Sequence, residues 1–158
     1  MKKFVTEIKW GLIFTLAGLL WMLLEKTLGW HDVLIAKHAI YTNLFAIIAI
    51  IIFVFALIEK RNKDLGGKMT WAQGIVSGVI ISFVVAILAP LSQYISHQLI
   101  SPNYFTNAIN YNVEIGALNQ KNAETLFNIK SYIIQAVFSA LGIGVFTAAV
   151  VAFFVKKK

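Results

Sequence analysis

Four long apolar stretches, separated by polar segments, dominate the pattern of the sequence. They run from about residue 10 to 28, 39 to 58, 71 to 95 and 132 to 155. A helix needs roughly 20 apolar residues to cross a bilayer, which is about the length of each stretch. The stretches are continuously apolar rather than alternating, and this favours helices over the strands of a membrane barrel. The pattern therefore predicts an all-α integral membrane protein, with four transmembrane helices in a single membrane domain, residues 1–158.

The polar segment between the second and third stretches predicts a tight turn. Gly66 and Gly67 can take the left-handed backbone conformation that ends a helix. Thr70 and Gln73 have the spacing of a capping box, in which each side chain bonds the backbone N–H of the other residue. We therefore expect the third helix to begin directly after Thr70. A plain flexible loop is the alternative.

The longest polar segment, residues 96–130, predicts one further short helix. Ser101 and Pro102 have the order of an N-cap residue and a proline at the first helical position. Apolar residues then recur every four positions, at Phe105, Ile109 and Val113. This spacing among asparagines is typical of a short amphipathic helix that lies along a membrane surface. We expect that helix to end near Gly116 or within 119–122.

The composition agrees with a membrane protein. The chain is 59% hydrophobic and 13% charged, whereas soluble domains are about half apolar and about a quarter charged. A water-soluble core of this size would not bury so much apolar surface. Met1 and the two lysines after it resemble the start of a signal peptide. The apolar run from Trp10 is too long for one and ends without a cleavage site, so we expect a retained transmembrane helix.

The positions of the basic residues predict the orientation, because Lys and Arg favour the cytoplasmic ends of membrane helices. With the N-terminus in the cytoplasm, the inner side holds ten: Lys2, Lys3, Lys9, Lys60, Arg61, Lys63, Lys68, Lys156, Lys157 and Lys158. The outer side holds four: Lys26, Lys37, Lys121 and Lys130. We therefore expect both termini in the cytoplasm and residues 96–130 outside. The net charge of +7 is explained by this topology rather than by a nucleic-acid surface.

No motif for a catalytic, cofactor or metal site is present in the sequence. There is no cysteine, no phosphate-binding glycine loop and no His-Glu-x-x-His motif. The three histidines, His31, His38 and His97, fall at or beyond the outer interface. We expect them to be solvated. A metal site shared by His31, Asp32 and His97 is the alternative.

Four polar side chains fall within or near the outer halves of the apolar stretches: Glu25, Asn43, Gln93 and Gln135. They could line an outward-facing polar pocket, since polar residues inside a membrane often mark a functional path. They could also form hydrogen bonds between helices, which is the simpler interpretation. For Glu25 the simplest expectation is a carboxylate that snorkels to the interface beside Lys26.

Small residues recur every four positions on the third and fourth predicted helices. The third has Gly74, Gly78, Ser82 and Ala86, and the fourth has Ala136, Ala140, Gly144, Ala148 and Ala152. Each set forms a ridge on one helical face that lets membrane helices approach closely. We expect these two helices to form the tightest pair.

Residues 64–78, which contain the glycine turn and the start of the third helix, resemble the pattern of a known family. It is a group of small four-helix membrane proteins of Bacteroidota, catalogued as domain of unknown function 4199. The resemblance covers nearly the whole chain: two helices, the Leu-Gly-Gly turn, a third helix with spaced glycines, a long outer loop and a final helix with a basic tail. It implies a fold and a bacterial inner membrane, and no activity or catalytic residue.

These observations favour a non-enzymatic component of the inner membrane, with an accessory, assembly or partner-binding role. The alternative is a small transporter or channel subunit that acts as an oligomer. The expected partners are the lipid bilayer and either other membrane proteins or further copies of this chain. No cofactor and no nucleic-acid partner is expected.

Overall fold

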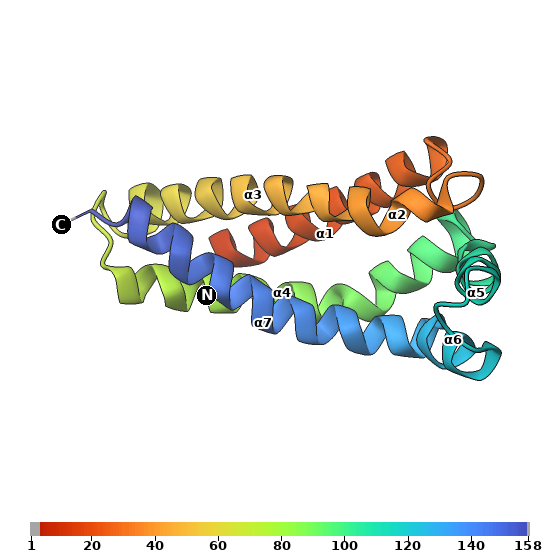
Figure 1. Ribbon diagram of the computed structural model, residues 1–158. Helices are drawn as coiled ribbons and strands as arrows, with labels where there is room; N and C mark the ends of the chain where they lie inside the picture. Colours follow the sequence, from red (N-terminus) through yellow and green to blue (C-terminus); the bar gives the residue numbers. More distant parts are fainter. Residues whose placement is uncertain (1–3, 158) are drawn as a thin grey trace.

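The computed structural model describes residues 4–157 as a bundle of long helices with short helices packed across one end (Figure 1). Four helical segments are long and apolar enough to cross a membrane: Val5–Thr27, Ile35–Asp64, Trp71–Ile100 and Ile129–Val155. The all-helical fold with four such segments confirms the prediction from the hydrophobic pattern. Lys2, Lys3 and Lys158, which entered the count of basic residues, lie outside the described residues.

The four segments contain the following elements. The first is α1 (Val5–Thr27). The second comprises α2 (Ile35–Tyr41), the 3-10 turn η1 (Thr42–Leu44), α3 (Phe45–Glu59) and the π-helical turn η2 (Lys60–Asp64). The third is α4 (Trp71–Tyr94), which continues as the π-helical turn η3 (Ile95–Ile100), and the fourth is α7 (Ile129–Val155). Between the last two lie α5 (Tyr104–Glu114) and α6 (Gln120–Leu126).

The turn before α4 has the predicted geometry. Gly66 and Gly67 have positive φ angles of 65° and 87°. The Thr70 N–H donates to Gln73 Oε1 at 2.8 Å, and the Gln73 N–H donates to Thr70 Oγ1 at 3.2 Å. Both bonds of the capping box are therefore present, and α4 begins at Trp71 as expected.

The segment between α4 and α7 differs from the prediction at its start. Ser101 and Pro102 do not begin the helix, because Asn103 is the N-cap residue of α5. The Ser101 hydroxyl is instead buried against His31, so it does not cap the helix. The helix α5 ends at Glu114, two residues before Gly116, whose φ is 69°. Residue Asn119 then caps α6, a second short helix that the sequence pattern did not predict.

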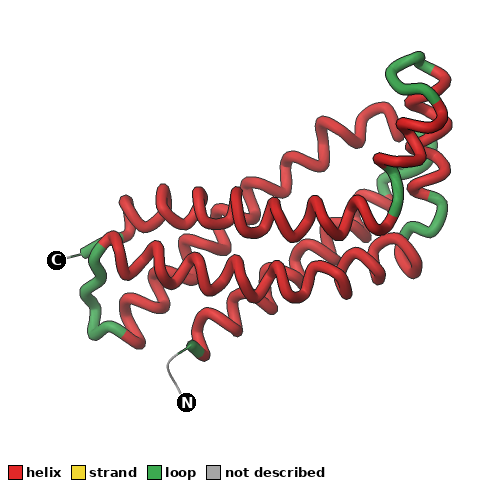
Figure 2. The backbone as a smooth tube through the Cα atoms, turned by 90° about the horizontal axis from the view of Figure 1, so that it is seen from below, coloured by secondary structure: helices red, strands yellow, loops and turns green. Residues whose placement is uncertain are grey.

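The core of the bundle lies in the half nearer the termini. It contains Phe53, Ala56, Leu57, Met69, Ile81, Ala148, Val151 and Ala152. The described ends of the chain lie at the same end of the bundle (Figure 2). Backbone bonds of 2.8 and 2.9 Å between Met69 and Lys157 tie the α3–α4 turn to the end of α7. The short helices α5 and α6 lie at the opposite end (Figure 1).

Helices α4 and α7 pack closely through small residues. A side chain at Gly74 would meet the Ala152 Cβ at 2.6 Å, and one at Gly78 would overlap Ala148. A side chain at Gly144 would overlap the Ser82 hydroxyl. These pairs are the ones expected for two antiparallel helices whose small-residue ridges face each other at equal depth. Two further members of the α7 ridge, Ala136 and Ala140, instead line a cavity described below.

Candidate functional site

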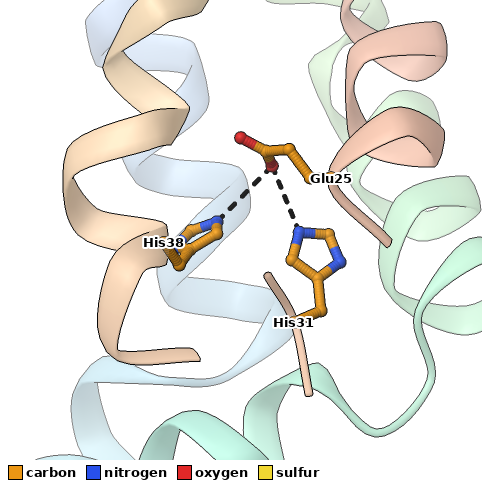
Figure 3. Close-up of side chains that lie close together, drawn as sticks. All are labelled: Glu25, His31 and His38. Atoms are coloured by element: carbon orange, nitrogen blue, oxygen red, sulfur yellow. Dashed lines mark hydrogen bonds and ion pairs between the residues drawn. The ribbon is translucent and has the colours of Figure 1, made fainter. Parts of the chain in front are cut away.

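A buried carboxylate at the end of α1 organises the candidate site. Glu25 lies in the last turn of α1 and is 1% exposed. Its Oε1 accepts a bond of 2.7 Å from the indole N–H of Trp21. Its Oε2 lies 3.1 Å from His31 Nε2 and 3.5 Å from His38 Nε2. Figure 3 shows the two imidazoles directed at the same carboxylate.

This arrangement corrects the interpretation of Glu25 as a snorkelling carboxylate. The chain turns back after α1, and the connection to α2 brings both histidines over the end of the helix. The neighbouring Lys26 is not the partner of Glu25, because its amine pairs with Asp32 Oδ2 at 2.5 Å. The carboxylate is therefore held inside the bundle by neutral or cationic donors on three sides.

The structure also corrects the expectation of solvated histidines. His31 is 0% exposed, and its Nδ1 lies 3.1 Å from Ser101 Oγ. The Asn107 side chain donates to the His31 carbonyl at 2.9 Å and to Asp32 Oδ1 at 3.0 Å. Ser101 lies just before α5 and Asn107 lies within it. The segment that contains α5 therefore covers His31. A single sequence does not show this long-range contact.

His38 and His97 lie on either side of a buried tyrosine. The Tyr104 hydroxyl is 3.4 Å from His38 Nδ1 and 2.9 Å from the Tyr132 hydroxyl. The His97 ring stacks on Phe105, with ring centres 4.4 Å apart, and is 3% exposed. Burial raises the pKa of the Tyr104 phenol far above its usual range, and the neighbouring Tyr132 adds to the shift. Tyr104 is therefore a neutral hydrogen-bonding group.

The alternative metal site of His31, Asp32 and His97 does not form. Among the described residues, the group whose ligand atoms all lie within 4.8 Å of one another is Glu25, His31 and His38. Asp32 is used by Lys26 and Asn107, as given above. Compared with the alternative set, His38 takes the place of His97, and Glu25 of α1 takes the place of Asp32.

A cavity of about 470 Å³ lies next to this cluster, between α1, α3, α4 and α7. The part nearest α5 is lined by Glu25, His38, Gln93, His97, Tyr104 and Tyr132. Apolar residues and small residues line the remainder as far as the middle of the bundle, where Phe53 and Gly144 lie. Three buried polar atoms of the lining have no hydrogen-bond partner among the described residues: Ser82 Oγ, Gln93 Oε1 and His97 Nδ1.

The polar residues singled out in the sequence divide accordingly. Glu25, Asn43 and Gln93 all line the cavity, whereas Gln135 is exposed and does not. The Asn43 side chain also donates to the Ala39 carbonyl at 2.7 Å. The histidines and tyrosines of the lining were not included in the predicted set, because His38, His97 and Tyr104 fall outside the apolar stretches and Tyr132 is the first residue of the last one. Their recurrence near the same ends of three stretches is the signal that could have found them.

A second buried carboxylate lies at the opposite end of α1, and the sequence analysis missed it. Glu7 is 1% exposed, pairs with the Lys60 amine at 2.8 Å and accepts a bond of 3.1 Å from Ser77 Oγ. Lys60 also pairs with Asp64 at 2.9 Å. The apolar stretch begins only at Trp10, whereas α1 begins at Val5 and therefore includes Glu7. None of these residues lines the cavity.

Comparison with known protein families identifies a match. A family model described as "Protein of unknown function (DUF4199)" matches residues 9–157. No curated protein and no solved structure matches the chain. The match covers all four membrane-length helices, the glycine turn and the segment that carries α5 and α6. The chain therefore belongs to the DUF4199 family.

Proposed function

We propose that the protein is a non-enzymatic accessory component of the bacterial inner membrane that binds a lipid-like molecule in its cavity. The observation that carries this proposal is a cavity of about 470 Å³ whose lining is mostly apolar and which has unpaired polar atoms near one end. Binding sites for small molecules are usually concave and mostly apolar, with a few polar groups that orient the ligand.

The unpaired atoms define the polar part of the ligand. A buried polar atom without a partner costs about 1–3 kcal/mol. Gln93 Oε1 can only accept a hydrogen bond, so the ligand must carry a hydroxyl or amino donor. His97 Nδ1 can donate or accept, and it completes the site. An acyl chain would occupy the apolar part towards Phe53. A hydroxyl- or amine-bearing lipid supplies both parts.

The proposed orientation places this polar end in the outer half of the bilayer. The ten inner and four outer basic residues support cytoplasmic termini. With this orientation, α5 covers the outer end of the bundle, and its Tyr104 and Ala108 side chains are buried. A polar head group at Gln93 and His97 would then lie near the depth at which lipid head groups begin.

The buried Ser101–His31–Glu25 chain does not argue for hydrolysis. A serine next to a histidine that contacts a carboxylate is the composition of a hydrolase relay. Here Ser101 and His31 are both 0% exposed and neither lines the cavity. A substrate in the cavity would not reach the Ser101 hydroxyl. The hydrogen bonds between Ser101, His31 and Glu25 therefore support a structural role for these three side chains.

The test is the lipid content of protein purified in mild detergent, measured by native mass spectrometry and by lipid extraction. Ala140 lines the cavity, whereas Gly142 on the same helix has open space around it and is not part of the lining. Wild type and Gly142→Phe are expected to retain the same lipid, and Ala140→Phe is expected to lose most of it. Equal lipid content in all three proteins would refute the proposal.

A transporter subunit is the second candidate, favoured by the two buried carboxylates of α1. Intramembrane acidic residues often mark ion paths. The cavity includes Glu25 but not Glu7, Lys60 or Ser77, so it ends near the middle of the bundle. Reconstituted liposomes loaded with a pH-sensitive dye would distinguish the two. Proton flux that is lost in Glu25→Gln would favour transport over lipid binding.

A further inference from the structure

We propose that Glu25, His31 and His38 form a binding site for a divalent transition-metal ion, with zinc as the best fit. The site is distinct from the lipid-binding function, because zinc binding by these three side chains does not require a molecule in the cavity. Its three ligands come from three places: the last turn of α1, the connection after it, and α2. All three are directed at one point (Figure 3).

The distances between the ligand atoms suit tetrahedral zinc. Zinc bonds imidazole nitrogen and carboxylate oxygen at roughly 2.0–2.2 Å, so neighbouring tetrahedral ligand atoms lie about 3.4 Å apart. Glu25 Oε2 is 3.1 Å from His31 Nε2 and 3.5 Å from His38 Nε2. The ligand atoms of the whole group lie within 4.8 Å of one another. Small side-chain rotations would therefore bring all three to bonding distance.

The outer partners of the two histidines have the arrangement found around bound zinc. A zinc-binding imidazole usually bonds a polar group through its second nitrogen, which fixes the ring and exposes the first nitrogen to the metal. His31 Nδ1 lies against Ser101 Oγ at 3.1 Å, and His38 Nδ1 lies against Tyr104 OH at 3.4 Å. Both Nε2 atoms are thereby left facing the carboxylate.

The buried negative charge of Glu25 is also compatible with a cation at this point. Glu25 is buried, and a buried carboxylate is costly unless a positive group or several donors compensate it. The nearest basic side chain in sequence, Lys26, is paired with Asp32. A zinc ion would neutralise Glu25 and join the two Nε2 atoms. Two imidazoles and one carboxylate favour zinc or iron(II) over magnesium, which prefers oxygen ligands alone.

The fourth coordination position would face the cavity. Glu25 and His38 line the cavity, whereas His31 is buried behind them. Three protein ligands with one open position are typical of zinc sites that bind a further molecule. A water molecule or an oxygen atom of the cavity's ligand would complete the tetrahedron.

The test uses the full-length protein in detergent, with any affinity tag removed and bound metal stripped by a chelator. Zinc chloride is titrated by isothermal calorimetry, and bound zinc is counted by elemental analysis. We expect one zinc ion per chain. His38→Asn and Glu25→Gln should each weaken zinc binding more than about 100-fold, and Tyr104→Phe about tenfold, the scale known for outer partners. The exposed Glu114 provides the matched control, so Glu114→Gln should bind like wild type.

Two further measurements keep the proposal decisive if a variant does not fold. The X-ray absorption spectrum of the zinc-loaded wild type should show two imidazoles and one or two oxygen ligands. Glu124→Gln should keep the wild-type zinc affinity, because Glu124 is exposed and outside the group of three. Absence of saturable zinc binding in wild type, a spectrum without imidazole, or loss of zinc in Glu124→Gln would each overturn the assignment. None of these outcomes bears on whether lipid occupies the cavity.

Discussion

At the scale of single residues, the two glutamates of α1 have the greatest consequences. Each is 1% exposed, and each is compensated by side chains from other elements. Removing one partner of a buried charge pair is costly because the remaining charge has lost both water and its counter-ion. From the sequence alone, Glu7 is expected outside the first helix and Glu25 at the interface. In the structure, both carboxylates are buried and bond side chains of other segments.

The pair of Glu7 and Lys60 gives a direct test. We expect Lys60→Met to lower the free energy of unfolding by about 2 kcal/mol, less than the roughly 3–5 kcal/mol of a fully buried pair, because the Lys60 side chain is 12% exposed. The control is Lys63→Met, since Lys63 pairs with Glu59 at the surface and such pairs contribute at most about 1 kcal/mol. Thermal unfolding in detergent measures both. The double variant Glu7→Gln/Lys60→Met should recover much of the loss, and no recovery would contradict the pairing.

Glu25 gives a second residue-scale test. Glu25→Gln keeps the shape of the side chain but weakens charge-assisted bonds to Trp21, His31 and His38. We expect a loss of about 1–3 kcal/mol in stability, measured in the presence of a chelator so that metal does not contribute. The exposed Glu114→Gln should change little. Equal stability of Glu25→Gln and wild type would show that the carboxylate is not an internal bonding partner.

At the scale of elements, local sequence patterns predicted the features whose structure depends only on residues close together in the sequence. The four long helices, the two positive-φ glycines of the turn before α4 and the Thr70 capping box all follow from apolar length, backbone freedom and the spacing of two side chains. The failure at Ser101 has the opposite cause. Its hydroxyl bonds His31, 70 residues away, and such a long-range contact is not encoded in local spacing. The same reason explains why Glu25, His31 and His38 were not recognised as one group.

The packing of α4 on α7 leads to a prediction for whole elements. Side chains at Gly78 and Gly144 would overlap Ala148 and Ser82, respectively. Gly78→Leu and Gly144→Leu should therefore each destabilise the fold by more than about 1 kcal/mol, since overpacking typically costs 1–3 kcal/mol. Gly142, which has open space around it, is the matched control on α7, and Gly142→Leu should be neutral or slightly stabilising.

Thermal unfolding and light scattering after size-exclusion chromatography separate the possible results of these substitutions. Loss of stability at constant mass would place both glycines in the contact within one chain. A fall in mass with unchanged monomer stability would instead place one ridge between two copies. Unchanged stability and mass in both variants would show that the small residues reflect composition alone.

At the scale of the whole molecule, the two ends of the bundle are held together by different kinds of contact. One end holds the described termini, the Glu7–Lys60 pair and the backbone bridge between Met69 and Lys157. The other end holds α5 and α6, the histidine cluster and the polar part of the cavity. Charge pairs and core packing therefore concentrate near the termini, and the polar part of the cavity lies away from them.

The orientation of that division in the membrane is the last prediction. We expect residue 62 in the cytoplasm and residue 106 outside, because ten of fourteen basic residues lie on the side of the termini. The chain has no cysteine, so Asn62→Cys and Thr106→Cys each introduce a single thiol at an exposed position. In intact spheroplasts, a membrane-impermeant maleimide should label Thr106→Cys and leave Asn62→Cys unlabelled until the membrane is opened. The reverse pattern would invert the protein and move the cavity to the inner leaflet. Labelling of both from the same side would contradict the topology, because residues 62 and 106 are separated by the single long segment Trp71–Ile100, which would then not cross the membrane.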